Sequence, residues 1–141
     1  MRNYSIGVVV FYQFPRSIKY LIIKHRKGHW SFPKGHQDNG ETKLETAIRE
    51  LKEETGISKI DLLKKQVMLK EKYKYAGKNN IKTLKKVDYF IAEARKQKVK
   101  IDDDEIVNYK WCTLNSALDT ITFKESRAMI KKADKIIKSY L

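Results

Sequence analysis

Cysteine is almost absent from this sequence, since Cys112 is the only one among 141 residues. A single cysteine excludes an intrachain disulfide and a cysteine-based zinc site, and it fits a reducing, cytoplasmic compartment. Long apolar runs are also absent, because none approaches the ~18 residues of a membrane span. The first twelve residues lack the pattern of a secretory signal. We therefore expect a cytoplasmic protein with no membrane partner, and its length fits one domain, residues 1–141.

Arginine is scarce although the chain is strongly basic. Lysine and arginine number 31 against 17 acidic residues, a formal net charge of +14, yet only six of the 31 are arginines. So basic a chain attracts polyanions: nucleic acid, an acidic membrane surface or a phosphate-rich small molecule. Because arginine is the usual residue for bidentate reading of bases, the dominance of lysine argues against sequence-specific DNA recognition. Compositional drift toward lysine explains the charge equally well.

Apolar periodicity divides the chain into strands and helices. Runs of β-branched and aromatic residues predict strands at 6–12, 18–24, 66–75, 87–94 and 106–112. The connections are polar: a turn at 13–17, a loop at 30–40, a hairpin loop at 76–81, a basic stretch at 95–100 and an acidic turn at 101–105. Strands on both sides of a central helix, with another helix at the end, indicate a layered α/β domain with a mixed sheet.

Two helices are predicted, at residues 42–55 and 123–140. Thr42 and Glu45 form a capping box at the start of the first helix, and Gly56 is placed to end it in a left-handed conformation. The apolar stripe of this helix consists of Leu44, Ala47, Ile48 and Leu51. The apolar face of the second helix consists of Met129, Ile130, Ala133, Ile136, Ile137 and Tyr140.

Three carboxylates crowd one face of the first helix. With Glu50 as the reference, Glu54 lies ~40° to one side and Glu53 ~60° to the other at 3.6 residues per turn. Like charges at this spacing repel, so something must offset them. Mg2+ does so naturally, because it prefers carboxylate oxygens and keeps waters for a substrate phosphate. Arg49 lies beside Glu53 and can orient one carboxylate. Taken alone, these residues are more typical of a solvated acidic helix face than of a metal site.

The residues around this helix complete a longer pattern. It has nine fixed positions across 23 residues, at Gly35, Glu41, Arg49-Glu50-Leu51, Glu53-Glu54 and Gly56-Ile57. A match at so many positions is far more specific than a lone glycine motif. The pattern is that of the Nudix box, so the chain resembles the Nudix hydrolases, which cleave a nucleoside diphosphate linked to another group. The resemblance implies a Nudix-type α/β/α sandwich with a mixed β-sheet, in which residues 35–57 form a loop–helix–loop.

Three shorter segments resemble one group of that family, the asymmetrically cleaving diadenosine tetraphosphate hydrolases. Residues 30–36 (WSFPKGH) look like its W-x-x-P-K-G-H entry to the box, and residues 122–125 (TFKE) look like its F-K-E segment. Residues 85–93 (KKVDYFIAE) look like its K-T-V-x-Y-W/F-L-A-E strand, with Lys86 in place of the usual threonine. The resemblance implies hydrolysis of diadenosine tetraphosphate to ATP and AMP.

The resemblance also implies metal ligands and catalytic groups. The expected ligands of Mg2+, for which Mn2+ is a substitute, are the carboxylates of Glu50, Glu53, Glu54 and Glu105 and the carbonyl oxygen of Gly35. Glu54 or a loop carboxylate would orient or deprotonate the attacking water, and Arg49 completes the catalytic set. Glu105 is equally readable as part of an ordinary acidic turn. Glu41 is expected to support the loop–helix connection.

Substrate-binding residues follow from the same resemblance. Lys34, His36 and Lys86 are candidates for binding the phosphates away from the metal, although most lysines in so lysine-rich a chain are simply solvated. Tyr75 and Phe123 match positions where aromatic rings stack on adenine. Depending on how the loop before the 85–93 strand is placed, Tyr73 or Tyr89 would take the place of Tyr75. Phe123 is equally readable as a core residue that opens the last helix.

Other functions stay open from the sequence alone. One is removal of pyrophosphate from the 5′ end of RNA, which a basic surface favours and which would show steep salt dependence. Others are hydrolysis of nucleoside triphosphates or of inositol pyrophosphates. A non-catalytic nucleotide sensor is the alternative of a different class, but a sensor is expected to lose the metal-binding carboxylates that this chain keeps. We expect a monomer that acts on a small nucleotide polyphosphate.

Overall fold

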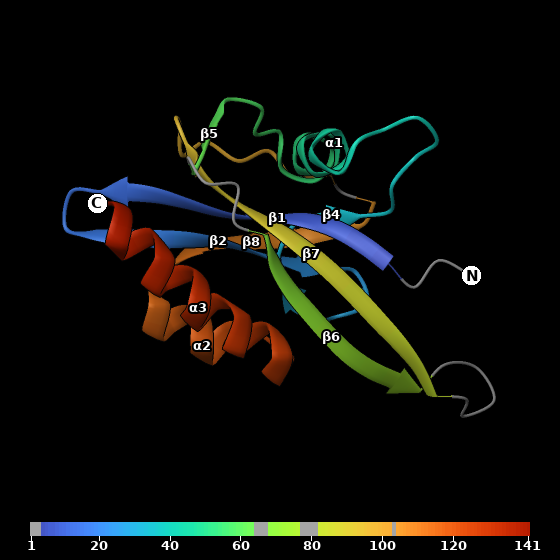
Figure 1. The fold of residues 1–141 in the computed structure, drawn as a ribbon. Helices are drawn as coiled ribbons and strands as arrows, with labels where there is room; N and C mark the ends of the chain where they lie inside the picture. The colour runs from blue at the N-terminus through green and yellow to red at the C-terminus, as the bar shows by residue number, and fades with distance from the viewer. Residues whose placement is uncertain (1–3, 64–67, 77–81, 103) are drawn as a thin grey trace.

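The computed structural model describes residues 4–63, 68–76, 82–102 and 104–141 (Figure 1). Its helices are α1 (Lys43–Thr55), α2 (Leu114–Thr120) and α3 (Lys124–Tyr140). Its strands are β1 (Tyr4–Phe14), β2 (Ser17–His25), β3 (Trp30–Ser31), β4 (Lys34–Gly35), β5 (Ile60–Leu62), β6 (Leu69–Ala76), β7 (Lys82–Ala94) and β8 (Ile106–Cys112).

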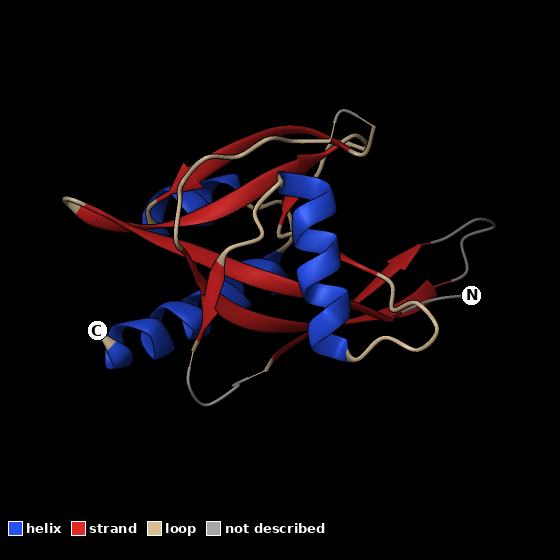
Figure 2. Ribbon diagram, turned by 90° about the horizontal axis from the view of Figure 1, so that it is seen from above, coloured by secondary structure: helices blue, strands red, loops and turns tan. Residues whose placement is uncertain are grey.

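The strands form one mixed sheet. Its main path runs β3-β2-β1-β7-β5, while β8 pairs with β2, β6 with β7 and β4 with β1. The central pair, β1 and β7, is parallel, and the other pairs are antiparallel. The long strands of the sheet twist across the molecule (Figure 2). Parallel strands need a crossover, and the segment between β1 and β7 includes α1.

Helices cover both faces of the sheet, as the sandwich prediction requires. Helix α1 lies over one face, and α2 and α3 lie over the other (Figure 1). A core cluster beneath α1 includes Val8, Leu21, Ala47, Leu51 and Phe90. A second cluster beneath α2 and α3 includes Val9, Tyr20, Met129, Ile130 and Ile137. Because both faces of β1 are covered, residues 5–11 of this strand are buried without alternation.

The predicted limits of α1 are confirmed. Thr42 is its N-cap, with reciprocal hydrogen bonds between Thr42 and Glu45 that form the capping box. Gly56 ends the helix with a φ of 74°, which favours glycine. One residue of the predicted apolar stripe was placed wrongly, since Ile48 is exposed. Tyr140 of α3 is also exposed rather than part of the buried face.

Three parts of the secondary structure were predicted wrongly or missed. Residues 30–40 are not wholly a loop, because β3 pairs with β2 and β4 pairs with β1. Such two-residue strands have no periodicity of their own and depend on these partners. The sequence also missed β5 and α2, which begins at the N-cap Thr113. The start of the strand predicted at 66–75 and most of the hairpin loop lie outside the described residues. No helix in the described part of the chain is long and apolar enough to cross a membrane.

Candidate active site

Gly35 places the loop of the box against α1. Its strand, β4, is fixed by pairing of Lys34 and Gly35 with Gly7 and Ile6 of β1. A Cβ atom on Gly35 would lie 2.0 Å from the Cδ atom of Glu50. Only glycine therefore lets this backbone lie directly against the Glu50 carboxylate.

Glu54 is a buried carboxylate, only 3% exposed. Its Oε1 atom accepts a hydrogen bond of 2.9 Å from the backbone nitrogen of Lys34. Burial is the main reason why its pKa is raised to about 8; the charges of Glu50 and Glu105 also raise this pKa, while Lys34 lowers it. In the folded protein, Glu54 therefore ionises easily at neutral pH only if a positive charge lies beside it.

Arg49 organises the other acidic residues of the box. Its guanidinium donates hydrogen bonds to Glu41 (2.6 Å), Glu50 (2.8 Å) and Glu53 (3.2 Å), and to the carbonyl oxygen of His36 (2.9 Å). The Arg49 hydrogen bond lowers the pKa of Glu41 to about 2. Glu41 thus ties the loop to the helix, in the supporting position expected for it.

The described residues enclose a cavity of about 590 Å³ beside these groups. Its lining includes five acidic residues, Asp38, Glu50, Glu54, Asp104 and Glu105. It also includes seven basic residues, His25, Arg26, Lys27, His29, Lys34, His36 and Lys85. The cavity therefore combines carboxylates that can hold a cation with cations that can hold phosphate.

Glu53 and Lys86 do not line this cavity, and neither do Arg49 and Phe123. The Glu53 side chain is 55% exposed and lies on Arg49 rather than among the cavity residues. Lys86 is exposed, and its neighbour Lys85 lines the cavity instead. Consecutive side chains of a strand point to opposite faces, so β7 can present only one of these two lysines. The sequence missed Lys85 because alternation alone does not show which face holds the site.

The donor set fits a hard divalent cation. Glu50, Glu54 and Glu105 supply carboxylate oxygens. The three groups are close enough that the charges of Glu50 and Glu105 raise the pKa of Glu54. Oxygen donors of this kind suit Mg2+ or Mn2+. As placed, however, no group of three His, Cys, Asp or Glu residues in the described part of the chain is arranged to hold an ion. A bound cation would therefore need these side chains to adjust.

A row of rings borders the cavity. The rings of Tyr73 and Phe123 stack with centroids 5.6 Å apart and an interplanar angle of 14°. Phe123 also lies 5.5 Å from the ring of His29, which stacks on His25 at 4.2 Å. The structure thus brings Tyr73 to Phe123. Tyr75 lies opposite Thr83 on β7, but its side chain is outside the described part.

The histidine pair predicts a pH-dependent stability. Burial lowers the pKa of His25 from 6.5 to about 3, helped by the charges of Lys34, His29 and Lys85, and burial lowers that of His29 to about 4. The unfolded chain binds more protons between pH ~6.5 and ~4, so this contribution to stability is present above pH 6.5 and is lost as the pH falls.

Replacing His25 by phenylalanine should therefore stabilise the protein increasingly as the pH falls. The flat ring keeps the stack on His29 and removes a buried Nε2 atom that has no hydrogen-bond partner among the described residues. The measurement is the melting temperature of both proteins from pH 7.5 to 4.5. A constant difference across this range would mean that His25 titrates normally.

The fold and this arrangement of carboxylates and cations define a phosphoanhydride hydrolase of the Nudix class. The chain belongs to the Nudix family: residues 1–133 match the NUDIX domain. This finding confirms the resemblance seen in the box and the expectation of an enzyme. The family generally uses divalent metal ions.

Within this family, the chain is similar to enzymes of two kinds, the asymmetrical tetraphosphatases and the RNA pyrophosphohydrolases. The chain is 35% identical to the asymmetrical bis(5′-nucleosyl)-tetraphosphatase of Mus musculus over 94% of each protein. It superposes on a crystal structure of a Caenorhabditis elegans Ap4A hydrolase binary complex with a TM-score of 0.82 and 27% identity, covering 98% of this chain and 99% of the other. It is also 27% identical to an RNA pyrophosphohydrolase of Nitratiruptor, over 83% of this chain and 81% of that protein.

Proposed function

We propose that this enzyme hydrolyses dinucleoside polyphosphates asymmetrically, with diadenosine tetraphosphate cleaved to ATP and AMP. The observation that supports this most is the cavity, which is lined by carboxylates and basic residues and whose lining residue His29 lies next to the stacked pair of Phe123 and Tyr73. The tetraphosphatase relatives support the same substrate class. The proposal includes a cytoplasmic, monomeric enzyme that acts with Mg2+, or with Mn2+ in its place.

The carboxylate side of the cavity would hold the metal. Glu50, Glu54, Glu105 and the carbonyl oxygen of Gly35 are the proposed ligands, and Glu53 would join them by leaving Arg49. When bound, the metal neutralises charge on the phosphates and lowers the pKa of a bound water. Glu54 or Glu105 orients the attacking water. The Lys34 backbone hydrogen bond fixes one oxygen of Glu54, so the other oxygen is available for this task.

The basic side would bind the phosphates that stay on ATP. Lys34 contributes from β4 and Lys85 from β7, and Lys85 thus takes the role first expected of Lys86. His36 lies in the loop beside Gly35 and lines the same cavity. At the edge, Phe123 and Tyr73 would separate to admit adenine, and stacking on a base contributes ~1–3 kcal/mol in nucleic-acid binders.

Hydrolysis in oxygen-18 water tests the reaction. If water attacks the phosphorus next to one adenosine, the label appears in AMP and not in ATP. The products are separated by chromatography, and mass spectrometry measures the oxygen-18 label in each. Label in ATP alone, or two molecules of ADP as products, would contradict the proposed register of the phosphate chain.

The second candidate is removal of pyrophosphate from the 5′ end of RNA. It is favoured by the net charge of +14 and by the similarity to RNA pyrophosphohydrolases. A 5′-triphosphorylated RNA should nevertheless be cleaved much more slowly than diadenosine tetraphosphate at physiological salt, since the phosphate backbone adds mainly salt-sensitive binding. Efficient pyrophosphate release from RNA with the dinucleotide left intact would favour this candidate instead.

A further inference from the structure

A buried carboxylate lies outside the catalytic set. Glu71 of β6 is only 3% exposed. Its Oε2 atom has no hydrogen-bond partner among the described residues. A buried carboxylate is unfavourable unless it is paired or neutralised. The hydrolytic reaction as proposed above gives this residue no task, so its position calls for a reason.

Strand register puts Glu71 on the same face of the sheet as Lys85. On β6 and β7, Glu71 is opposite Val87 and Tyr73 is opposite Lys85. Directly opposed residues share a face, and diagonal neighbours are within reach of long side chains. Lys85 is therefore a diagonal neighbour of Glu71, and it lines the active-site cavity.

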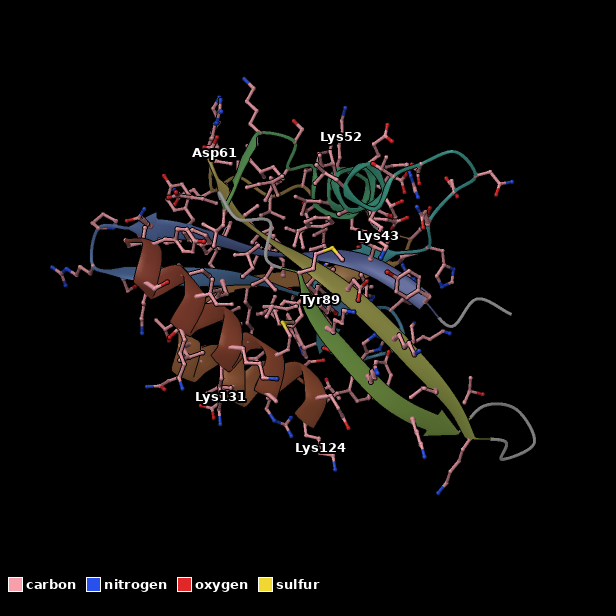
Figure 3. The ribbon with its side chains drawn as sticks, in the orientation of Figure 1. Lys43, Lys52, Asp61, Tyr89, Lys124 and Lys131 are labelled. Carbon is pink, nitrogen blue, oxygen red and sulfur yellow. The ribbon has the colours of Figure 1, made fainter. Side chains whose placement is uncertain are left out.

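Lys34 reaches this face from the other side. Tyr89 lies on β7 opposite Leu69, the first residue of β6 (Figure 3). A Cβ atom on Gly7 would meet both the Tyr89 ring, at 2.9 Å, and the Cβ atom of Lys34, at 2.8 Å. Lys34 and Tyr89 therefore pack side by side over Gly7. The two lysines of the phosphate-binding side thus flank the strip of sheet that carries the buried carboxylate.

The electrostatics agree with this geometry. Burial lowers the pKa of Lys34 to about 8, and the charge of Glu71 is the largest influence that raises it. Burial also lowers the pKa of Lys85, and Glu71 again opposes that shift. Burial raises the pKa of Glu71 itself, while Ser126 and the two lysines lower it. The negative charge of Glu71 therefore favours the protonated form of each lysine, and the positive charge of each lysine favours the ionised form of Glu71.

We propose that Glu71 is a positioning residue whose buried carboxylate is the shared counter-charge that holds the ammonium groups of Lys34 and Lys85 at the cavity wall. This inference rests on the proposed function, in which those lysines bind the phosphate chain. Glu71 touches no phosphate itself. By contrast, Lys124 and Lys131 are exposed and project from α3 into solvent (Figure 3).

A double-mutant cycle tests the inference. Glu71→Gln should raise the KM for diadenosine tetraphosphate about 10-fold with little change in kcat, because a loss of equal binding to ground and transition states appears in KM. Lys34→Met should also raise KM. In the Lys34→Met, Lys85→Met background, Glu71→Gln should add nothing further, since coupled residues are not additive. Glu93→Gln is the matched control, because Glu93 lies on β7 with an exposed hydrogen bond to Gln13.

A merely structural role would give a different result. Glu71→Gln would then lower the melting temperature and leave KM unchanged, or it would raise KM by its full factor even in the Lys34→Met, Lys85→Met background. Either result would overturn the inference. A lower KM would also overturn it, because Glu71 would then act only by repelling the substrate. If Glu71→Gln does not fold, Glu71→Met fills the same space without a buried polar group and is measured in the same cycle.

Failure of the proposed function would be visible separately. If the unaltered enzyme does not cleave diadenosine tetraphosphate, the substrate assignment is wrong, but the cycle can still be run on binding. Calorimetric binding of inorganic tripolyphosphate in EDTA replaces KM as the readout. A dissociation constant that rises about 10-fold in Glu71→Gln only when both lysines are present supports the inference. An unchanged constant contradicts it.

Discussion

Replacing Glu54 by glutamine is expected to reduce turnover more than ~100-fold, because the loss of an outer partner of a metal site alone costs ~10–100-fold. The change keeps the size of the side chain and the oxygen that accepts from the Lys34 backbone. It removes the charge that the proposed metal site needs. Turnover in Mg2+ measures the effect, and near-normal turnover would remove Glu54 from the catalytic set.

The same substitution should stabilise the protein when metal is absent. Burial raises the pKa of Glu54 from 4.5 to about 8, so the folded state binds more protons than the unfolded state in that interval. Stability therefore falls as the pH rises from 4.5 to 8, and Glu54→Gln removes this loss. In EDTA the variant should melt higher than the unaltered protein at pH 8, with the difference shrinking toward pH 4.5.

Glu45→Gln is the matched control for these experiments. Glu45 lies on the same helix, is exposed, and closes the capping box. Glutamine serves at this position too, so the helix start is preserved. This variant should keep both activity and pH dependence, and a similar loss of activity in it would mean that any change of charge on α1 disturbs the enzyme.

Replacing Gly35 by alanine is expected to reduce turnover by about 10–100-fold, the range found when groups that orient metal ligands are lost. The new methyl group would lie 2.0 Å from the Cδ atom of Glu50. Either the carboxylate or β4 must move, and both belong to the proposed metal site. Turnover and the Mg2+ concentration for half-maximal activity should both change.

Gly40→Asn is the control for that prediction. Gly40 lies in the loop between β4 and α1 and has a φ of 84°, and a Cβ atom added there would meet open space. Asparagine tolerates this backbone conformation better than most residues. The control should stay close to normal activity. If Gly35→Ala does so as well, the contact between Gly35 and Glu50 is not needed for catalysis.

Local sequence was enough to predict α1 and its ends. Thr42, Glu45 and Gly56 act through hydrogen bonds and dihedral preferences within a few residues, so their effects can be read along the chain. The short strands β3 and β4 could not be read in this way, because each has two residues and exists through pairing with β2 or β1. Ile48 shows the same limit, since helical spacing does not say how wide the covered face is.

The sequence by itself determined the Nudix class and the helix on which the carboxylates lie, because nine spaced positions and a helical period need no partner to be recognised. Only the tertiary structure decided which residues share the cavity. Lys85 rather than Lys86 lines it, Tyr73 stacks on Phe123, and Glu71 is buried beside the site. Each of these facts depends on which face of the sheet a side chain occupies, and therefore on how β6 pairs with β7 and on how β6 packs against α3.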